Sequence, residues 1–426
     1  MQQVAETLET LLAPGRRFRL SPLVEATQLV VLFGQPPDDR RRAESIRALL
    51  EDPASQRVLD EITGAWEAFQ GGGKRFGNRD TYQGTFLRSY LAYYTTSNLP
   101  KLQAVLTELL RDGSFPPRSG GERALRVLDI GVGPGTTALA VFDFLLAWES
   151  CCRLWNEPFP LDSVELTGID RSVEALKFAQ TVTQVFGEQI DRWLAHREAA
   201  LSPSGGERGV RSGHAWAARV RAACDAAQWE RVDLTLAEHR GRAKELVHWA
   251  DIVVVSYVLR ELRDAGSEDS LSAVLAEARP GALVLLLEAG SRSDAIGLMR
   301  WRRGFLQQHP GFRTVLPCGQ EFGPELPDCC DSCWPSRREG LHQTALYRAF
   351  VDRCETLRQM DGRYDEFENE LLSWTYVVLE RQPAGVLHRV DCPPRVQIPL
   401  TGEPVTLTTR FIGSFHNKKP SIPAEP

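Results

Sequence analysis

A glycine-rich turn after a short apolar run is the segment of this sequence whose residue types point most directly to chemistry. The run Arg126–Ile130 contains Asp129 and is followed by Gly131, Gly133 and Gly135. Glycine lets the backbone approach a ligand closely and reach positive φ. A helix that begins after such a turn also offers free backbone N–H groups. The pattern predicts a strand, a turn and a helix N-terminus that together bind a small molecule.

The spacing of these glycines separates the candidate ligands. A dinucleotide fingerprint has its third glycine three residues after the second, where this chain has Thr136, and the Gly-Lys-Ser/Thr of a phosphate-binding P-loop is absent. The G-x-G-x-G spacing after Asp129 instead resembles the first motif of class I S-adenosylmethionine-dependent methyltransferases. This resemblance implies that Asp129, Gly131, Gly133 and Gly135 lie against the amino-acid and ribose portions of S-adenosylmethionine. A purely structural glycine turn is the alternative.

Two further predicted strands end beside this turn. The strand Val164–Ile169 is followed by Asp170, and a carboxylate that accepts two hydroxyls binds a ribose diol more strongly than a neutral acceptor does. The strand Asp251–Ser256 leads into Tyr257, which places Ser256 and Tyr257 at the carboxyl edge of the sheet, where such folds bind ligands. We therefore add Asp170 and Ser256 to the expected cofactor-binding residues.

The sequence does not identify catalytic residues. After the strand Asp251–Ser256 it lacks the Asn/Asp-Pro-Pro-Tyr motif with which many amino-methylating enzymes hold their target nitrogen. Methyl transfer can proceed mainly by proximity and alignment, so this absence leaves the activity open. Glu261 and Glu288 are candidate site carboxylates, and a structural or solvated role is the alternative for each.

Cysteine is concentrated in one segment of the chain. Four of the nine cysteines lie close together: Cys318, Cys329, Cys330 and Cys333. Soft thiolate ligands select zinc or an iron–sulfur cluster. Since adjacent cysteines seldom face one metal, we expect only one of Cys329 and Cys330 to be a ligand, and the fourth ligand to be Cys392 or, as second choice, Cys354. A loop of reduced thiols without metal is the alternative.

The elements that must position these residues follow from hydrophobic periodicity. Helical spacing of apolar residues runs through Leu23–Phe33, Ile46–Leu59 and Leu87–Leu110. Further along, short β-rich runs alternate with helical ones, which predicts βαβ units and a mostly parallel sheet. The strands expected in this alternation are Arg126–Ile130, Val164–Ile169, Val232–Leu236, Asp251–Ser256 and Ala282–Glu288. Two further strands are expected nearer the C-terminus, at Trp374–Glu380 and Pro404–Phe411. The fold class is therefore α/β, a Rossmann-like sheet with a helical N-terminal domain and a cysteine-rich C-terminal insertion.

Changes in hydrophobic periodicity and composition along the chain suggest four parts. A helical N-terminal domain covers 1–120, and the S-adenosylmethionine-binding Rossmann-like domain covers 121–311. The cysteine-rich segment and C-terminal strands cover 312–415, and the Pro- and Lys-rich tail 416–426 is expected to be disordered.

Composition excludes several classes of protein. With 42% hydrophobic and 25% charged residues, the chain is neither collagen-like nor wholly disordered. Its 50 basic and 56 acidic residues give a net charge of −6, which argues against a broadly basic nucleic-acid binder and leaves room for a restricted basic face. No apolar run approaches the roughly 20 residues that span a bilayer, and no signal-peptide core is visible, so we expect a cytoplasmic protein. The odd cysteine count argues against a disulfide framework.

Several segments together resemble the methyltransferase-like ribosomal small-subunit proteins of bacteria and mitochondria. Ser256–Leu262 resembles that family's Ser-Tyr-Val-Leu-x-Glu-Leu, and Leu286–Ser291 its Glu-Pro-Gly-Thr segment, with alanine in place of proline. The cysteine region, the basic pair Arg337 and Arg338, and Ser373–Leu379 are similar in order to its metal-binding insertion and following strand.

The resemblance spans most of residues 80–395 and implies a role on the small ribosomal subunit, in rRNA methylation or assembly. It also implies bound S-adenosylmethionine and a [4Fe–4S] cluster, with zinc as the alternative. The alternatives for function are a methyltransferase for a small molecule or a protein, and a catalytically silent assembly factor.

A basic surface for RNA phosphates is available in the sequence, and Trp301 lies within it, where it can stack on a base. Its arginines are Arg292, Arg300, Arg302, Arg303, Arg337 and Arg338. The alternative is a solvated helix face whose arginine stems cover apolar surface.

Overall fold

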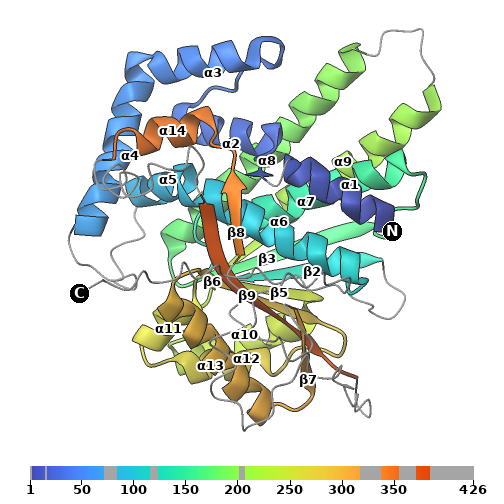
Figure 1. Ribbon diagram of the computed structural model, residues 1–426, viewed down its shortest axis with the longest axis vertical. Helices are drawn as coiled ribbons and strands as arrows, with labels where there is room; N and C mark the ends of the chain where they lie inside the picture. Colours follow the sequence, from blue (N-terminus) through green and yellow to red (C-terminus); the bar gives the residue numbers. More distant parts are fainter. Residues whose placement is uncertain are drawn as a thin grey trace, which may run out of the picture.

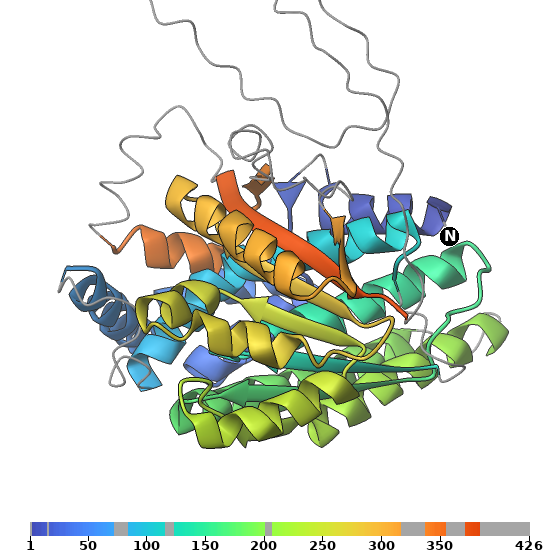
Figure 2. The ribbon, with the colours of Figure 1, turned by 90° about the horizontal axis from the view of Figure 1, so that it is seen from below.

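A nine-stranded sheet forms the centre of the computed structural model, which describes residues 2–14, 17–71, 84–115, 123–200, 207–316, 337–354 and 371–383. Helices cover both faces of this sheet (Figures 1 and 2). The strands are β1 (Arg17–Phe18), β2 (Ala124–Ile130), β3 (Ser163–Asp170), β4 (Gln228–Arg231), β5 (Ile252–Ser256), β6 (Leu283–Ala289), β7 (Phe312–Leu316), β8 (Arg337–Leu341) and β9 (Leu371–Arg381).

The strand order places the ends of β2 and β5 at the centre of the molecule. Strands β4, β3, β2, β5 and β6 are parallel and adjacent in that order. The antiparallel β9 then lies between β6 and β7, and β8 pairs with the first half of β9. This is the sheet that the resemblance to class I methyltransferases implies, so the predicted α/β class with a mostly parallel sheet is confirmed.

Continuous apolar runs form the central strands because both faces of the sheet are covered. Alternate residues of one strand point to opposite faces. Thus Val127 and Val254 pack with the N-terminal helices, whereas Leu128 and Val253 pack with the helices on the other side.

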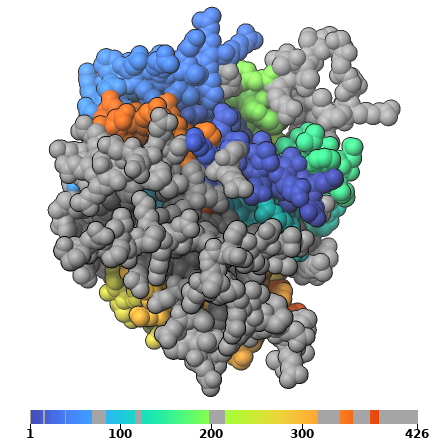
Figure 3. Space-filling model, viewed as in Figure 1, coloured from blue at the N-terminus to red at the C-terminus, as the bar shows by residue number. Residues whose placement is uncertain are grey.

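Two groups of helices supply these coverings. The first face carries α1 (Gln2–Leu12), α2 (Pro22–Phe33), α5 (Gly84–Ala92), α6 (Tyr94–Asp112), α7 (Thr136–Leu154), α8 (Val173–Ala200) and α9 (Glu207–Ala226). The second face carries α10 (Ala237–Trp249), α11 (Leu259–Asp264), α12 (Glu268–Leu275) and α13 (Arg292–Gln308). Outside the first group lie η2 (Asp39–Arg41), α3 (Arg42–Glu51), α4 (Pro53–Gly71) and α14 (Ala345–Val351), and Figure 3 shows α14 in orange against the blue α3 and α4.

Helix α6 is the element that joins the N-terminal helices to the sheet. Every residue from 95 to 110 is buried. Its polar residues find partners inside the protein, since Glu108 accepts a hydrogen bond of 2.8 Å from Tyr376 of β9 and Gln103 donates one of 2.8 Å to Asp143 of α7. The N-terminal helices and the sheet therefore share one hydrophobic core.

Two sequence-based expectations about elements are wrong. The strand expected at Val232–Leu236 lies earlier, as β4, because Asp233 begins a turn in which its carboxylate accepts from the Thr235 backbone N–H at 3.0 Å. The apolar alternation there reflects loop side chains that pack on the sheet. The helix expected over Ile46–Leu59 is divided between α3 and α4, because the residue before a proline is disfavoured in helical conformation and Asp52 is extended.

The cysteine-rich segment and the tail lie outside the described residues, as does the expected strand at 404–411. None of the helices in the described ranges combines the length and the apolar character needed to cross a bilayer.

Candidate functional site

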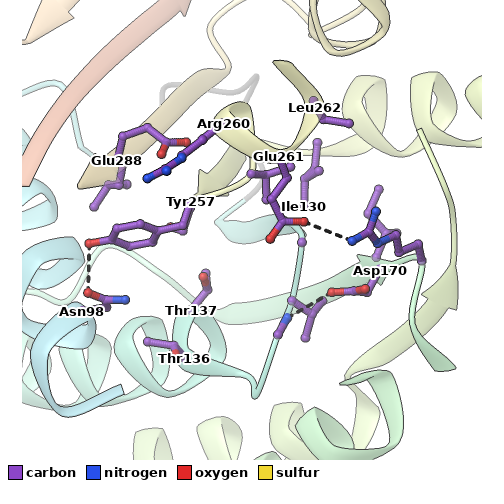
Figure 4. A pocket seen from close by; sticks show the side chains of 18 of the residues that line it. Asn98, Ile130, Thr136, Thr137, Asp170, Tyr257, Arg260, Glu261, Leu262 and Glu288 are labelled. Atoms are coloured by element: carbon purple, nitrogen blue, oxygen red, sulfur yellow. Dashed lines mark hydrogen bonds and ion pairs between the residues drawn. The ribbon is translucent and has the colours of Figure 1, made fainter. Parts of the chain in front are cut away.

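A cavity of about 280 Å³ opens at the carboxyl ends of the parallel strands, where the strand order reverses between β2 and β5 (Figure 4). Such switch points are where open α/β sheets bind ligands. Of the predicted cofactor residues, Gly131, Gly133, Asp170 and Ser256 line this cavity, whereas Asp129 and Gly135 do not.

The three glycines have different roles. Gly131 has φ of +81°, and a Cβ at this position would overlap the Val258 side chain. Gly133 has φ of +52° and open space around the position of a Cβ. Gly135 caps α7 and lies against α8, where a Cβ would meet Ala179 Cα at 3.2 Å. Gly133 thus leaves room in the cavity, whereas Gly135 serves helix packing.

Asp170 holds the glycine turn in place. Its Oδ2 accepts a hydrogen bond of 3.1 Å from the Gly133 backbone N–H, and its Oδ1 accepts one of 2.8 Å from the Ser172 backbone N–H. Burial raises the pKa of this carboxyl, and the two backbone N–H groups act in the opposite direction. Each oxygen keeps a lone pair for a ligand hydroxyl.

Asp129 lies in β2 beneath the turn and is 1% exposed. Neither of its carboxylate oxygens has a hydrogen bond partner among the described residues. Burial raises the pKa of Asp129 to about 7, the neighbouring Thr137 side chain lowers it, and the Asp170 carboxylate raises it further. The glycine turn lies between this carboxyl and the cavity, which Asp129 does not line.

Tyr257, which follows β5, adopts a strained backbone conformation at the edge of the cavity. Its φ is +61°, which is uncommon for a bulky residue and costs of the order of 1–3 kcal/mol. Three contacts hold it: its N–H donates to Leu287 O at 2.8 Å, its Oη donates to Asn98 Oδ1 at 2.9 Å, and Lys101 Nζ donates to its Oη at 3.1 Å. Lys101 Nζ also donates to Asn98 Oδ1 at 2.9 Å, so one polar cluster joins the sheet edge to α6.

The N-terminal helices supply a wall of the cavity that our sequence reasoning missed. The lining residues are Tyr90 from α5 and Tyr94, Asn98 and Leu102 from α6. The four-residue spacing of Tyr94, Asn98 and Leu102 was visible in the sequence and is the spacing that places side chains on one helix face.

The two candidate carboxylates both line the cavity. Glu261 forms an ion pair with Arg171 at 3.4 Å. Glu288 is buried, and its Oε1 accepts from the Leu259 backbone N–H at 3.0 Å. Burial, together with the nearby Asp294 carboxylate, raises the pKa of Glu288 to about 8. The raised pKa favours the protonated form of Glu288, which can donate a hydrogen bond.

The predicted metal ligands Cys318, Cys329, Cys330, Cys333 and Cys392 all lie outside the described residues. Within those residues, no group of three or more His, Cys, Asp or Glu side chains is arranged to hold a metal ion. The second-choice ligand, Cys354, is fully buried just after α14.

Two residues of the predicted basic surface, Trp301 and Arg302, are buried. Trp301 is buried, stacks on Phe305 with ring centroids 5.0 Å apart, and donates its indole N–H to Ser272, so the prediction that it stacks on a base is wrong. Arg302 is also buried, which leaves Arg300 exposed and Arg303 half-buried on α13. The side chains of Arg292, Arg337 and Arg338 are outside the described set.

Comparison with solved structures gives low similarity scores. A SAM-dependent methyltransferase from Anabaena variabilis is 11% identical over 75% of this chain and 95% of that one, with a TM-score of 0.33. A class I methyltransferase from Listeria monocytogenes is 10% identical over 90% and 88%, with a TM-score of 0.30. The rRNA methyltransferase aviRa from Streptomyces viridochromogenes is 13% identical over 45% and 74%, with a TM-score of 0.26. The fold assignment therefore rests on the strand order.

The sequence itself matches one family. No curated protein matches the chain. Residues 218–400, however, match the family described as "Mitochondrial small ribosomal subunit Rsm22". The match begins within α9 and includes Ser256–Leu262 and Leu286–Ser291, two of the segments that carry the resemblance, whereas the glycine turn precedes it. The resemblance read from the sequence is thereby confirmed: over residues 218–400 this chain matches the Rsm22 family of mitochondrial small ribosomal subunit proteins.

Proposed function

We propose that this protein binds S-adenosylmethionine and acts on or with the small ribosomal subunit, as a methyltransferase or a methyltransferase-like assembly protein. The observation that carries the proposal is the cavity at the β2–β5 switch point, with its glycine turn, in a chain that also matches a small-subunit family.

The residues around the cavity suit the cofactor. Asp170 has acceptor capacity for a ribose diol, and Gly133 leaves space beside it. The resemblance also assigns Asp129 to the amino-acid portion of the cofactor, although this residue lies beneath the turn and does not line the cavity. Ser256 ends β5 at the same edge. When bound, S-adenosylmethionine supplies an electrophilic methyl group, and the chain's part is to orient it and to exclude water.

The ribosomal part of the proposal follows from the family match. The matched range covers the second face of the sheet and the cysteine-rich segment. The family description names a mitochondrial subunit. We therefore infer that the chain works in the mitochondrion, where that subunit is found. Fractionation of cells that express the tagged chain tests this inference. Recovery in the mitochondrial fraction supports it, and recovery in the cytoplasmic fraction supports the localisation expected from the sequence.

A cysteine-ligated metal centre forms the second part of the proposal. Thiolates are the ligands that zinc and iron–sulfur clusters prefer. Strands β7 and β8, which precede and follow residues 317–336 in the sequence, both pair with β9. The proposed ligands are Cys318, Cys333 and one of Cys329 and Cys330, with Cys392 as the fourth ligand and Cys354 as the second choice for it.

The first experiment is co-sedimentation of the purified full chain with small ribosomal subunits at low salt. We expect association, and its absence contradicts the ribosomal role and favours a small-molecule or protein methyltransferase. Transfer of labelled methyl groups from S-adenosylmethionine to subunits then separates an enzyme from a catalytically silent assembly factor.

The metal centre is tested by purification without oxygen. We expect absorption near roughly 400 nm from a thiolate-ligated cluster. A colourless protein that contains about one zinc per chain supports a zinc site and rejects the cluster, and a metal-free protein rejects both.

A further inference from the structure

The cavity has two chemically different ends. Figure 4 shows Asp170 at one end and the hydrogen-bonded pair of Tyr257 and Asn98 at the other. If the Asp170 end holds the ribose of the cofactor, as proposed above, the end walled by α5 and α6 is left for the group that receives the methyl.

The Asn98 amide has a defined orientation. Its Oδ1 accepts from Tyr257 Oη and from Lys101 Nζ, both at 2.9 Å. Because two donors fix which atom is the oxygen, the amide nitrogen lies on the other side, and Figure 4 shows it turned toward the interior of the cavity. One N–H group of this amide is shared with the Tyr90 hydroxyl. An amide nitrogen carries two N–H groups, so the second is left for a ligand.

Two tyrosine rings stand beside this amide. Tyr90 and Tyr94 have ring centroids 4.7 Å apart and an interplanar angle of 45°. Trp66 contacts Tyr94 edge-on at 4.8 Å, and Tyr93 contacts it at 5.1 Å. Since Tyr94 is packed against other rings, it is a rigid aromatic surface.

A cation lies at the same cavity. Arg260 lines it, and its side chain is 52% exposed, with Asp294 at 3.7 Å. An exposed guanidinium in this position is available to a phosphate.

We propose that Tyr90, Tyr94 and Asn98 form the acceptor subsite of this protein, and that the acceptor is an unstacked RNA base. The base places its ring on the tyrosines and an acceptor atom of its edge against the Asn98 amide, while a neighbouring phosphate meets Arg260. Enzymes that modify bases read the extruded base in this way, by stacking and by hydrogen bonds to its edge. A peptide amide would use the donor but not the ring surface or the cation, so the base is favoured.

This inference rests on the proposed function, and its test measures the two separately. Calorimetry with S-adenosylhomocysteine first tests the cofactor site. Fluorescence anisotropy of the full chain, saturated with S-adenosylhomocysteine, then measures binding of labelled octamers of abasic ribonucleotides that carry one central A, C, G or U, or no base. If S-adenosylhomocysteine does not bind, the proposed function fails. The same octamers still test whether the subsite of Tyr90, Tyr94 and Asn98 binds a base.

We expect at least one of the four bases to improve affinity about fivefold or more over the fully abasic octamer, as a stacked base does. Tyr94→Ala removes the stacking ring and Asn98→Asp removes the N–H donor, so each should reduce the preference for a base below about twofold. Both variants should keep their affinity for S-adenosylhomocysteine. Tyr94→Phe, which keeps the ring, and Arg111→Ala at the exposed end of α6 should retain it.

Equal affinity for all five octamers overturns the proposal, and so does a preference that survives Tyr94→Ala. A glutamine-containing peptide that displaces the base with higher affinity would identify a protein acceptor and also overturn it. Thermal unfolding of each variant shows whether a lost preference reflects a lost fold.

Discussion

Tyr257 Oη donates a hydrogen bond of 2.9 Å to Asn98 Oδ1 and so links residues 159 positions apart in the sequence. One partner follows the central strand β5, and the other lies in a helix of the N-terminal segment. Through this contact the strained loop after β5 and the buried α6 form one wall of the cavity. The site is therefore assembled jointly by the sheet and the N-terminal helices.

Tyr257→Phe should destabilise the protein by about 1–3 kcal/mol, because the buried Asn98 oxygen and Lys101 ammonium each lose a partner. Urea unfolding measures the change. In a Lys101→Met background the same substitution should cost less, with a coupling of about 0.5–3 kcal/mol. Additive effects of the two substitutions would show that the cluster does not act as a unit.

Gly131→Ala and Gly133→Ala should behave differently although both glycines have positive φ. At Gly131 the new methyl overlaps Val258, so we expect a loss of stability of about 2 kcal/mol or more, from backbone strain and overpacking together. At Gly133 the methyl meets open space, so the loss should be only about 1–2 kcal/mol of backbone strain.

The same Gly133 methyl stands in the cavity, so affinity for S-adenosylhomocysteine should fall about 5- to 100-fold, the penalty of overfilling a site by roughly 1–3 kcal/mol. Calorimetry on the folded variant measures it. Wild-type affinity in Gly133→Ala would place the cofactor elsewhere.

Asp170→Asn should weaken binding of S-adenosylhomocysteine about 5- to 100-fold, the effect of roughly 1–3 kcal/mol for a lost acceptor. The amide can offer only one oxygen to the two backbone donors Gly133 and Ser172, so the turn also loosens. The matched control is Glu165→Gln, an exposed carboxylate on the same strand. Equal affinities of the two variants would remove Asp170 from the cofactor site.

The glycine turn and Asp170 could be predicted from the sequence because each lies where a strand ends, and local patterns specify such junctions. The amide of Gly133 and the carboxylate of Asp170 meet because β2 and β3 are adjacent parallel strands. Ser256 follows the same rule on β5.

The aromatic wall could not be predicted in the same way. Tyr90 on α5 and Tyr94 and Asn98 on α6 reach the cavity because these two helices pack in the shared core with the sheet and other helices. This packing depends on contacts far apart in the sequence. Trp301 was misread for a related reason: its arginine neighbours suggested an exposed face, but the indole faces the core beneath α13. Strand β7 was missed because its partner, β9, lies about sixty residues further along the chain.

Glu288 should make the stability of the protein depend on pH. Its pKa is raised from 4.5 to about 8 in the folded state by burial and by Asp294. Between these two values the unfolded chain has released the proton while the native state keeps it, so the free energy of unfolding falls as pH rises, by at most about 1.4 kcal/mol per pH unit for this group. The contribution is fully present below pH 4.5 and is lost as the pH rises through about 8.

Urea unfolding at several pH values between about 5 and 8, with Glu288→Gln compared with wild type, measures this contribution. The amide keeps an oxygen for the Leu259 N–H but cannot titrate, so the variant should lose part of the downward slope and gain stability relative to wild type as the pH rises. Glu238→Gln, at an exposed position on α10, is the matched control and should follow wild type. Parallel curves for Glu288→Gln and wild type would mean that Glu288 is ionised in the folded protein, and its role as a neutral hydrogen bond donor in the cavity would then be wrong.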